Sequence, residues 1–416
     1  MKRTTGRFSG LSIMLPLLLT SCGTLSEMQV EENPHEVKQF ACSQNPDDMV
    51  DSVAQRYLHK EKSSGMAVGI IRNNGPARTW GYGYTNAVNG YKIDGETLFA
   101  LGSVSKGVTG EVVAGLVDKG QLKWDDKLTD LLPKNIPLSE DAKNITLLQL
   151  ATHTSGLPRQ NMTKNMLESF LRYLYTGDNF YHELDSDAVV GDLSSFKRPL
   201  LHVPQYSNLG YALLGYILKL KTGEDIQQLS YAFIFDSLKM GNTSFYASQL
   251  KAYPYRAIGH AGDQPKLIRR GEVVPDWHFS NNMVAAASLY SNADDLLKYL
   301  RAHIDDSQPG DLNAAIQVTE KIYFQRKIEA ANIAWVTDYK DDQVITYQVG
   351  YIGGYSSYIG FDKKHKNAVV VLQNSFNWSN YMGHDLLLKM AMADDYKGTC
   401  GKETLFFSPV KRGEAR

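Results

Sequence analysis

The segment Leu101-Gly102-Ser103-Val104-Ser105-Lys106-Gly107-Val108 places a serine three residues before a lysine, at the point where an apolar run becomes helical. Residues i and i+3 share one face of a helix, so the hydroxyl of Ser103 and the amine of Lys106 should point the same way. The start of a helix also offers unpaired N–H groups and a positive dipole end, which favour an alkoxide and an oxyanion. The pattern predicts Ser103 as a nucleophile and Lys106 as its base. The alternative is a chance tetrapeptide, with an ordinary serine cap and a solvated lysine.

The composition of the chain is that of an ordinary globular protein. Its 416 residues include 45 acidic and 44 basic side chains, and 43% of the residues are hydrophobic. Such a balanced charge does not favour nucleic acid or another polyanion as a partner. The length allows one large domain or two.

The pattern of the N-terminal residues indicates a targeting segment. Lys2, Arg3 and Arg7 precede a short apolar run, Leu11 to Leu19, which is too short for a permanent membrane span. The following Leu-Thr-Ser-Cys resembles a bacterial lipobox, which implies a lipoprotein signal peptide over residues 1–22 and lipidation of Cys22. A plain signal peptide with a coincidental cysteine is the alternative. The lipobox reading implies a bacterial cell envelope protein, lipid-anchored through Cys22, and Gly23 leans towards the periplasm-facing side of the outer membrane.

Two further cysteines lie near the ends of the chain. Cys42 and Cys400 remain once Cys22 is lipidated, and an isolated pair in an oxidising compartment can form a disulfide. Such a bond would close nearly the whole domain and stabilise it by roughly 4–5 kcal/mol in the chain-entropy model. The alternative is two free buried thiols.

The order of predicted elements indicates an α+β fold. Strands are expected near residues 66–71 and 78–84 and again near 344–348, 357–361 and 368–372, with helices between the two groups and a closing helix over 377–393. One antiparallel sheet would then be built from both ends of the chain and flanked by helices, with a mostly helical region inserted. We therefore expect a tether over 23–45, a domain over 46–400 and a tail over 401–416. Within the domain, the α/β part should comprise about 46–130 and 290–400, and the helical part about 131–289.

Several blocks, in order, resemble one known family. Residues 97–106 (Thr-Leu-Phe-Ala-Leu-Gly-Ser-Val-Ser-Lys) resemble the nucleophile block of class C β-lactamases and related penicillin-recognising hydrolases. Residues 144–158, ending His-Thr-Ser-Gly-Leu-Pro, resemble the loop that follows it. Tyr206-Ser207-Asn208 matches the Tyr-x-Asn motif, and residues 353–358 resemble the segment past the third motif. The resemblance extends over about residues 46–395 and implies the β-lactamase/transpeptidase-like fold.

The resemblance also implies roles for individual residues. Tyr206 would relay a proton, since a tyrosine held beside a lysine loses its proton more readily and can accept that of the serine. Asn208 would orient Lys106 and bind a substrate amide, and Gln160 matches a position that contacts the acyl side chain. Taken alone, Tyr206 could equally be a buried aromatic residue of a loop.

The third motif departs from the family pattern. Where the family shows Lys-Thr-Gly or His-x-Gly, this chain has Gln348-Val349-Gly350. Gly350 keeps room for a close backbone approach, and the N–H of Tyr351 could complete an oxyanion hole with that of Ser103. The missing ammonium would have contributed roughly 1.5–3 kcal/mol to holding a substrate carboxylate. Its loss disfavours β-lactams and D-alanyl peptides and leaves ester hydrolysis unaffected.

Other candidate motifs are less consistent with the fold. The missing Lys-Thr-Gly motif occurs elsewhere in the chain, as Lys221-Thr222-Gly223. This triplet is expected to end the helix that begins near Leu209, with Gly223 as the helix cap. Residues 280–282 (Ser-Asn-Asn) are expected to be a loop. His153 and His202 are weaker candidates for a base, because a Ser-His-Asp triad would need a Gly-x-Ser-x-Gly elbow that Gly102-Ser103 does not supply.

The sequence thus predicts a serine hydrolase that acts through an acyl-enzyme on amide or ester bonds. Its substrate would be a D-alanyl peptide or β-lactam, or a carboxylic ester, and peptidoglycan is a possible partner. No metal or organic cofactor is implied. The alternative is a non-catalytic ligand-sensing lipoprotein with a penicillin-binding fold, although a sensor would not need Ser103, Lys106 and Tyr206 together.

Overall fold

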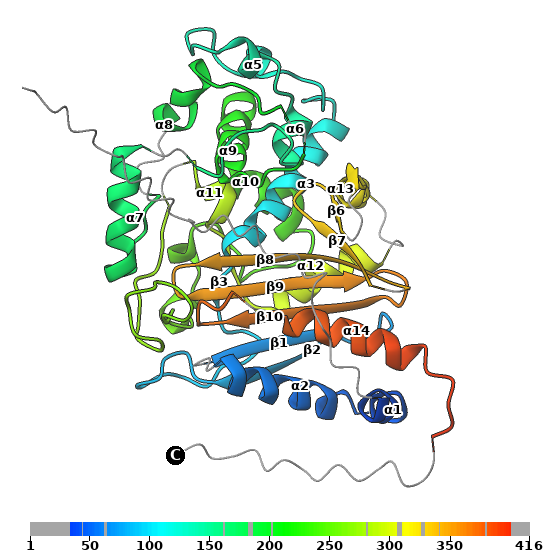
Figure 1. Cartoon of the computed structure of the whole chain (residues 1–416). Helices are drawn as coiled ribbons and strands as arrows, with labels where there is room; N and C mark the ends of the chain where they lie inside the picture. The colour runs from blue at the N-terminus through cyan, green and yellow to red at the C-terminus, as the bar shows by residue number, and fades with distance from the viewer. Residues whose placement is uncertain are drawn as a thin grey trace, which may run out of the picture.

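A central antiparallel sheet organises the protein in the computed structural model, which describes residues 34–400 except 44, 62–64, 161–162, 182–185, 201–202, 280–281, 306–309, 326–328, 341 and 379–380. Eight described strands pair in the order β2-β1-β10-β9-β8-β7-β6-β5 (Figure 1). Their bounds are β1 Gly65–Ile71, β2 Arg78–Gly83, β5 Phe324–Gln325, β6 Glu329–Ala331, β7 Val336–Lys340, β8 Gln343–Ile352, β9 Tyr355–Asp362 and β10 Asn367–Gln373. A separate pair joins β3 Phe99–Ala100 to β4 Tyr290–Ser291.

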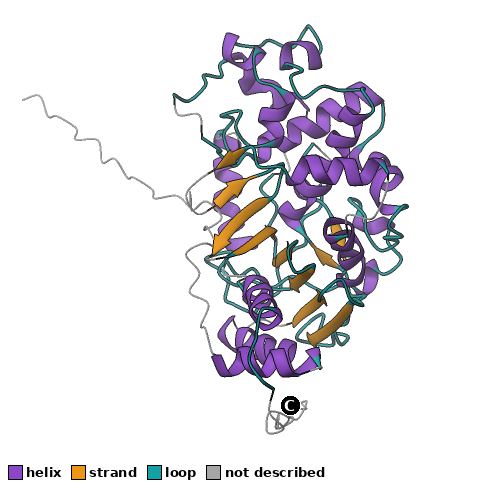
Figure 2. Ribbon diagram, turned by 90° about the vertical axis from the view of Figure 1, so that its right-hand side faces the viewer, coloured by secondary structure: helices purple, strands orange, loops and turns teal. Residues whose placement is uncertain are grey.

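Helices cover both faces of this sheet. One face packs on α2 (Pro46–Glu61) and α14 (Met382–Asp394), and the other on α12 (Ala293–Ile304) and α3 (Ser105–Asp118) (Figure 2). The alternation of β1 explains the division, because Met66 and Val68 belong to the α2/α14 core, whereas Ala67 belongs to the larger core around α3 and α12. Both faces of the sheet are therefore buried, and β1, β9 and β10 are buried along their whole length.

A helical region lies above β8 in the view of Figure 1. It is built from α4 Leu128–Leu131, α5 Glu140–Lys143, α6 Leu147–Ala151, α7 Lys164–Thr176, α8 Ser186–Gly191, α9 Asn208–Thr222, α10 Ile226–Ser230 and α11 Val284–Ala287. The remaining helices are α1 Pro34–Cys42 and α13 Asp311–Glu320. The predicted α+β fold with an inserted helical region is confirmed.

The N-terminal boundary differs from the prediction. Residues 34–42 form α1, so the tether expected over 23–45 is wrong for these residues. Lys389 of α14, which is buried, explains the difference, because its Nζ lies 3.0 Å from Glu36 Oε2 and holds α1 against the sheet domain. The expected signal peptide with Cys22, the tail over 401–416, His202 and most of 280–282 lie outside the described residues.

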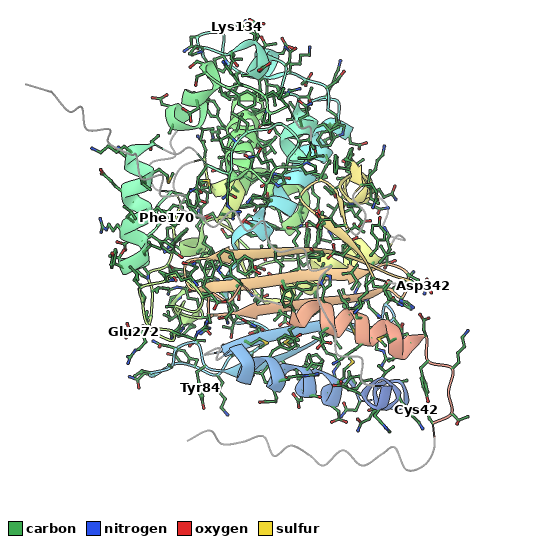
Figure 3. The ribbon with its side chains drawn as sticks, in the orientation of Figure 1. Cys42, Tyr84, Lys134, Phe170, Glu272 and Asp342 are labelled. Atoms are coloured by element: carbon green, nitrogen blue, oxygen red, sulfur yellow. A yellow bond between two sulfur atoms is a disulfide. The ribbon has the colours of Figure 1, made fainter. Side chains whose placement is uncertain are left out.

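The predicted disulfide between Cys42 and Cys400 is present, with the two Cα atoms 5.4 Å apart across 358 residues of sequence. Cys42 ends α1 at the edge of the molecule (Figure 3). The bond therefore fixes the last described residues to the first described helix.

We expect Cys42→Ser with Cys400→Ser to lower the free energy of unfolding by about 2–5 kcal/mol, because the unfolded chain loses its largest loop constraint. Denaturant unfolding of the wild type, with and without reductant, measures the effect. The double variant should not respond to reductant. Equal midpoints for oxidised wild type and variant would contradict the prediction.

None of the helices within the described residues is long and apolar enough to cross a membrane.

Candidate active site

The turn that carries Ser103 is held rigidly by its neighbours. Gly102 has a φ of +53°, a conformation that glycine adopts without strain, and it begins a short 3-10 turn over Gly102–Val104. The hydroxyl of Ser105 donates to the Gly102 carbonyl at 2.6 Å and accepts from the Leu289 N–H at 2.9 Å. Ser103 was expected to open the α-helix, but it lies in the 3-10 turn and α3 begins two residues later.

Ser103, Lys106 and Tyr206 meet at one oxygen atom. Lys106 Nζ donates to Ser103 Oγ at 3.1 Å, and the Tyr206 hydroxyl donates to the same atom at 2.5 Å. Tyr206 lies 103 residues from Ser103 in sequence, so only the tertiary fold joins them. The arrangement is that of a nucleophile with two proton-transfer partners.

Lys106 is buried, with 2% of its surface exposed. Its Nζ also donates to the Ala286 carbonyl of α11 at 2.8 Å, and it lies 5.0 Å from the ring centre of Tyr206 and 5.8 Å from that of Tyr211. A carbonyl and two aromatic faces therefore hold the amine in place beside Ser103.

Tyr206 is positioned by the first turn of α9. Ser207 caps this helix, because its Oγ accepts from the Gly210 N–H at 2.9 Å and donates to the Pro158 carbonyl at 2.7 Å. The Ser207 N–H donates to His153 Nδ1 at 3.1 Å, and the His153 ring packs on Tyr206 with 4.6 Å between ring centres. His153 thus supports Tyr206, and no described hydrogen bond links it to Ser103.

His153 is neutral in this environment. Burial and the positive charges of Lys106 and Arg159 lower the pKa of His153 to about 3. A neutral Nδ1 can accept the Ser207 N–H, which fits the observed contact.

Asn208 and Gln160 meet through Tyr181, a residue that sequence reasoning missed. Asn208 Nδ2 donates to the Tyr181 hydroxyl at 3.0 Å, which donates to Gln160 Oε1 at 2.6 Å. Burial raises the pKa of Tyr181, while the positive charge of Arg159 and the Asn208 hydrogen bond oppose the rise. Tyr181 belongs to no recognisable motif, so the sequence carried no signal for it; Arg159 was detectable only as the charged neighbour of Gln160.

The third-motif segment of β8 packs directly against the Ser103 turn. The pairing of β7 with β8 ends at Tyr347, whereas β9 continues to Ile352, so the edge of residues 348–352 is not covered by the described part of β7. A Cβ on Gly350 would lie 1.9 Å from the Leu101 carbonyl oxygen, and one on Gly102 would lie 3.0 Å from the Tyr351 nitrogen. The two backbones are therefore in contact, as the sequence predicted for Gly350.

Gln348 is buried with 4% exposure, and within the described residues its side-chain amide has no hydrogen-bond partner. The amide lies over Gly107 of α3, where a Cβ would come within 2.1 Å of Nε2. A neutral amide thus occupies the position that the sequence comparison assigns to the third motif.

Gly350→Ala should reduce acyl transfer at least about 10²-fold, because its Cβ would displace β8 from the Ser103 turn and misplace the reacting groups. Gly191→Ala is the matched control, since a Cβ there meets nothing within 4 Å. Rates of ester hydrolysis measure both variants. Equal rates in Gly350→Ala and Gly191→Ala would refute the close packing of β8.

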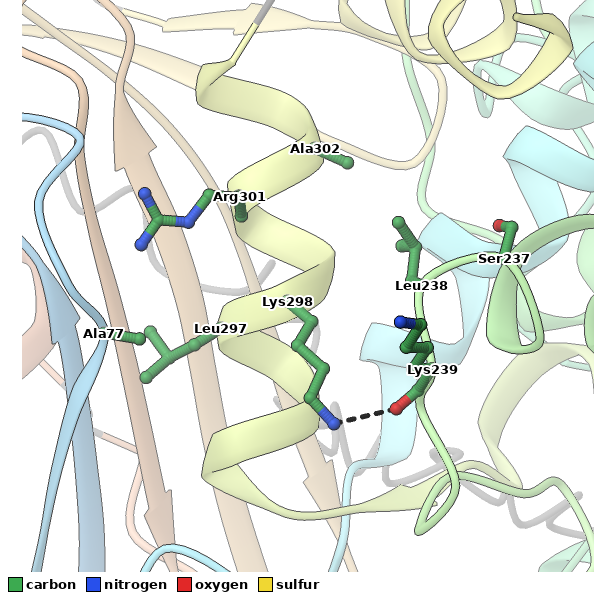
Figure 4. Close-up of a pocket in the computed structure, with 8 residues that line it drawn as sticks. All are labelled: Ala77, Ser237, Leu238, Lys239, Leu297, Lys298, Arg301 and Ala302. Atoms are coloured by element: carbon green, nitrogen blue, oxygen red, sulfur yellow. Dashed lines mark hydrogen bonds between the residues drawn. The ribbon is translucent and has the colours of Figure 1, made fainter.

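The remaining candidates lie elsewhere. Lys221-Thr222-Gly223 ends α9, and Gly223 caps it with a φ of +77°, as predicted. A pocket between α12 and the loop Ser237–Lys239 contains none of the predicted site residues (Figure 4). Within the described residues, no group of three or more His, Cys, Asp or Glu side chains is placed to hold a metal ion.

The fold and the arrangement of this site are those of the β-lactamase and penicillin-binding superfamily of serine hydrolases. The Beta-lactamase family model matches residues 50–391, and the chain belongs to this family. Among curated relatives, the chain is 24% identical over 335 residues to "Protein flp" of Staphylococcus aureus (strain NCTC 8325 / PS 47), with 78% of this chain and 62% of the relative covered. It is 27% identical over 249 residues to "Putative penicillin-binding protein PbpX" of Bacillus subtilis (strain 168), covering 60% and 57%. The chain thus spans less than two thirds of either relative.

Solved structures share the fold. The class C β-lactamase from Rhodobacter sphaeroides is 21% identical with a TM-score of 0.69, covering 83% of this chain and 98% of that one. The octameric penicillin-binding protein homologue from Pyrococcus abyssi is 24% identical with a TM-score of 0.70, covering 83% and 78%. At these identities the likeness establishes the fold alone.

Proposed function

We propose that this protein hydrolyses an ester or amide through an acyl-enzyme on Ser103. The observation that carries the proposal is the convergence of Lys106 Nζ and the Tyr206 hydroxyl on Ser103 Oγ, at 3.1 and 2.5 Å. A nucleophile within hydrogen-bond reach of a proton-transfer partner is the arrangement that acyl transfer requires, and Ser103 has two such partners.

The proposed reaction has two steps. Ser103 Oγ attacks the substrate carbonyl while its proton passes to the Lys106–Tyr206 pair, which returns it to the leaving group as the carbonyl–leaving-group bond breaks. Water then attacks the acyl-enzyme and gives its proton to the same pair, which returns that proton to Ser103 Oγ as the bond between the acyl carbon and Oγ breaks and the acid is released. The N–H groups of Ser103 and Tyr351 would bind the oxyanion, a role supported by the contact between their two backbone segments.

Gln348 favours carboxylic esters or small amides over β-lactams and D-alanyl peptides. Its amide carries no charge, so a substrate carboxylate there would lose a charge-assisted contact worth roughly 1.5–3 kcal/mol. The D-alanyl peptide remains the second candidate, since the predicted envelope location would bring the protein to peptidoglycan. Lipidation of Cys22 and an outer-membrane position are part of this proposal; an unchanged membrane fraction and lipid labelling in Cys22→Ser would refute them.

Intact mass spectrometry separates these substrates. Residues 23–416 would be incubated with a penicillin and separately with an activated short-chain ester, with Ser103→Ala as control. Ester turnover without a penicillin adduct supports the esterase. A persistent penicillin adduct that is absent from the variant points to the cell wall. Ligand binding without any Ser103-dependent turnover or adduct would favour the non-catalytic sensor.

A further inference from the structure

Two cations flank the ring of Tyr206. Lys106 Nζ and Arg159 Cζ each lie 5.0 Å from its ring centre. Lys106 comes from α3, whereas Arg159 comes from the loop after α6, whose backbone is tied to α9 because the Asn208 N–H donates to the Arg159 carbonyl at 3.0 Å. The loop that carries Arg159 therefore contacts the first turn of α9, and the Arg159 side chain also hydrogen-bonds to Tyr181.

Two further groups that lie against Tyr206 carry no charge. In the described part of the chain, these are His153, which packs on the ring, and Tyr211, which follows in α9. The low pKa of His153 keeps its imidazole neutral, and burial raises the pKa of Tyr211 well above its ordinary value. Hence the two charged groups found against Tyr206 are both positive.

The effect of these charges on His153 shows the sign of the electrostatic field beside the Tyr206 ring. Both Lys106 and Arg159 disfavour a positive charge on its ring, which lies 4.6 Å from that of Tyr206. The same field favours a negative charge on the neighbouring phenol, since the sign of the interaction reverses with the sign of the charge.

We propose that Arg159 is a positioning residue for the reaction: its guanidinium, with Lys106, stabilises the deprotonated form of Tyr206 and so prepares it to accept the Ser103 proton. Gln348 explains why a second cation is needed, because the third-motif position supplies none. The positive charge near the Tyr206 ring comes instead from Lys106 and Arg159. This inference rests on the proposed function only for its kinetic consequence.

The direct test follows the phenol itself. The purified protein would be labelled with ¹³Cζ-tyrosine, and the Tyr206 signal would be assigned by its loss in Tyr206→Phe. In Arg159→Gln the titration of this signal should move to higher pH by about one unit or more. In Arg159→Lys, which keeps the positive charge, the titration should stay close to that of the wild type. Arg269→Gln is the matched control, since it removes one charge from a side chain that is 84% exposed. An unchanged Tyr206 titration in Arg159→Gln overturns the proposal whether or not the protein is a hydrolase.

Kinetics distinguish an action on Tyr206 from an action on the substrate. For a neutral ester and for an ester bearing a carboxylate, Arg159→Gln should lower kcat about tenfold at pH 7 by the same factor, with KM little changed and the acidic limb of the pH profile moved to higher pH. A loss confined to the carboxylate ester, seen mainly in KM, would overturn the proposal in favour of direct substrate binding. If the wild type forms no Ser103 adduct with any ester, the proposed function fails, and the NMR titration still decides the role of Arg159.

Discussion

Ser103→Ala is expected to abolish acyl transfer, with a loss of at least about 10³-fold in kcat and no covalent adduct by intact mass. The alanine removes the one atom on which Lys106 and Tyr206 converge. Tyr206→Phe should also cost about 10²–10⁴-fold, because it removes a group placed to accept the serine proton while leaving the ring in its packing against His153.

Lys221→Ala provides the matched control for these variants. Lys221 begins the Lys-Thr-Gly triplet at the end of α9 and is exposed, where its Nζ donates to the Asp130 carbonyl at 2.9 Å. The activity of Lys221→Ala should equal that of the wild type. Full activity in Ser103→Ala would refute the mechanism, and loss of activity in Lys221→Ala would reopen the identity of the third motif.

Glu111→Gln is expected to lower the free energy of unfolding by about 3–5 kcal/mol, because it removes one of the two carboxylates beside His303, a buried cation. Glu111 lies on α3, and its Oε1 is 3.1 Å from His303 Nε2 of α12 and 2.6 Å from the Tyr299 hydroxyl. His303 Nδ1 lies 2.8 Å from Glu320 Oε1 of α13. The side chains of Glu111 and His303 are fully buried, so water cannot replace a lost partner.

The same network predicts a pH dependence of stability. Burial alone would lower the pKa of His303, but the carboxylates of Glu111 and Glu320 outweigh burial and raise it to about 9. Because the folded pKa lies above the unfolded value near 6.5, the contribution of His303 is complete below about pH 6.5 and disappears as the pH rises through about 9. The contribution of His303 to the free energy of unfolding is about 3 kcal/mol, from the difference between a pKa of about 9 and one of 6.5.

Denaturant unfolding between pH 5 and pH 10 tests both statements. The wild type should lose stability above neutral pH more steeply than Glu111→Gln. Asp311→Asn is the control, since Asp311 of α13 pairs with Lys119 beyond the end of α3 at 3.5 Å, with the two side chains 61% and 45% exposed. It should change unfolding by less than about 1 kcal/mol. Parallel pH profiles for the wild type and Glu111→Gln would contradict the assignment of charge to His303.

Local sequence pattern sufficed to predict the longer strands of the sheet and several of the long helices. The apolar runs of β1, β8, β9 and β10 and the stripe of α9 all lie where periodicity places them, because the central sheet is buried on both faces. The short strands β5–β7 were missed, since they have weak patterns and follow the sheet edge. Helix α1 was also missed, because a buried ion pair between Glu36 and Lys389 stabilises it and local sequence does not.

The sequence by itself singled out the candidate nucleophile, the Tyr-x-Asn motif and the altered third motif, because each consists of residues that are close together in the chain. It also predicted the disulfide, because only two cysteines remain beside Cys22. Only the tertiary structure decided that Tyr181 bridges Asn208 and Gln160, that Arg159 and Lys106 flank one ring, and that Gln348 lies over Gly107. These contacts join segments that are distant along the chain. Their distances depend on how α3, α9 and β8 pack against one another, which no local pattern encodes.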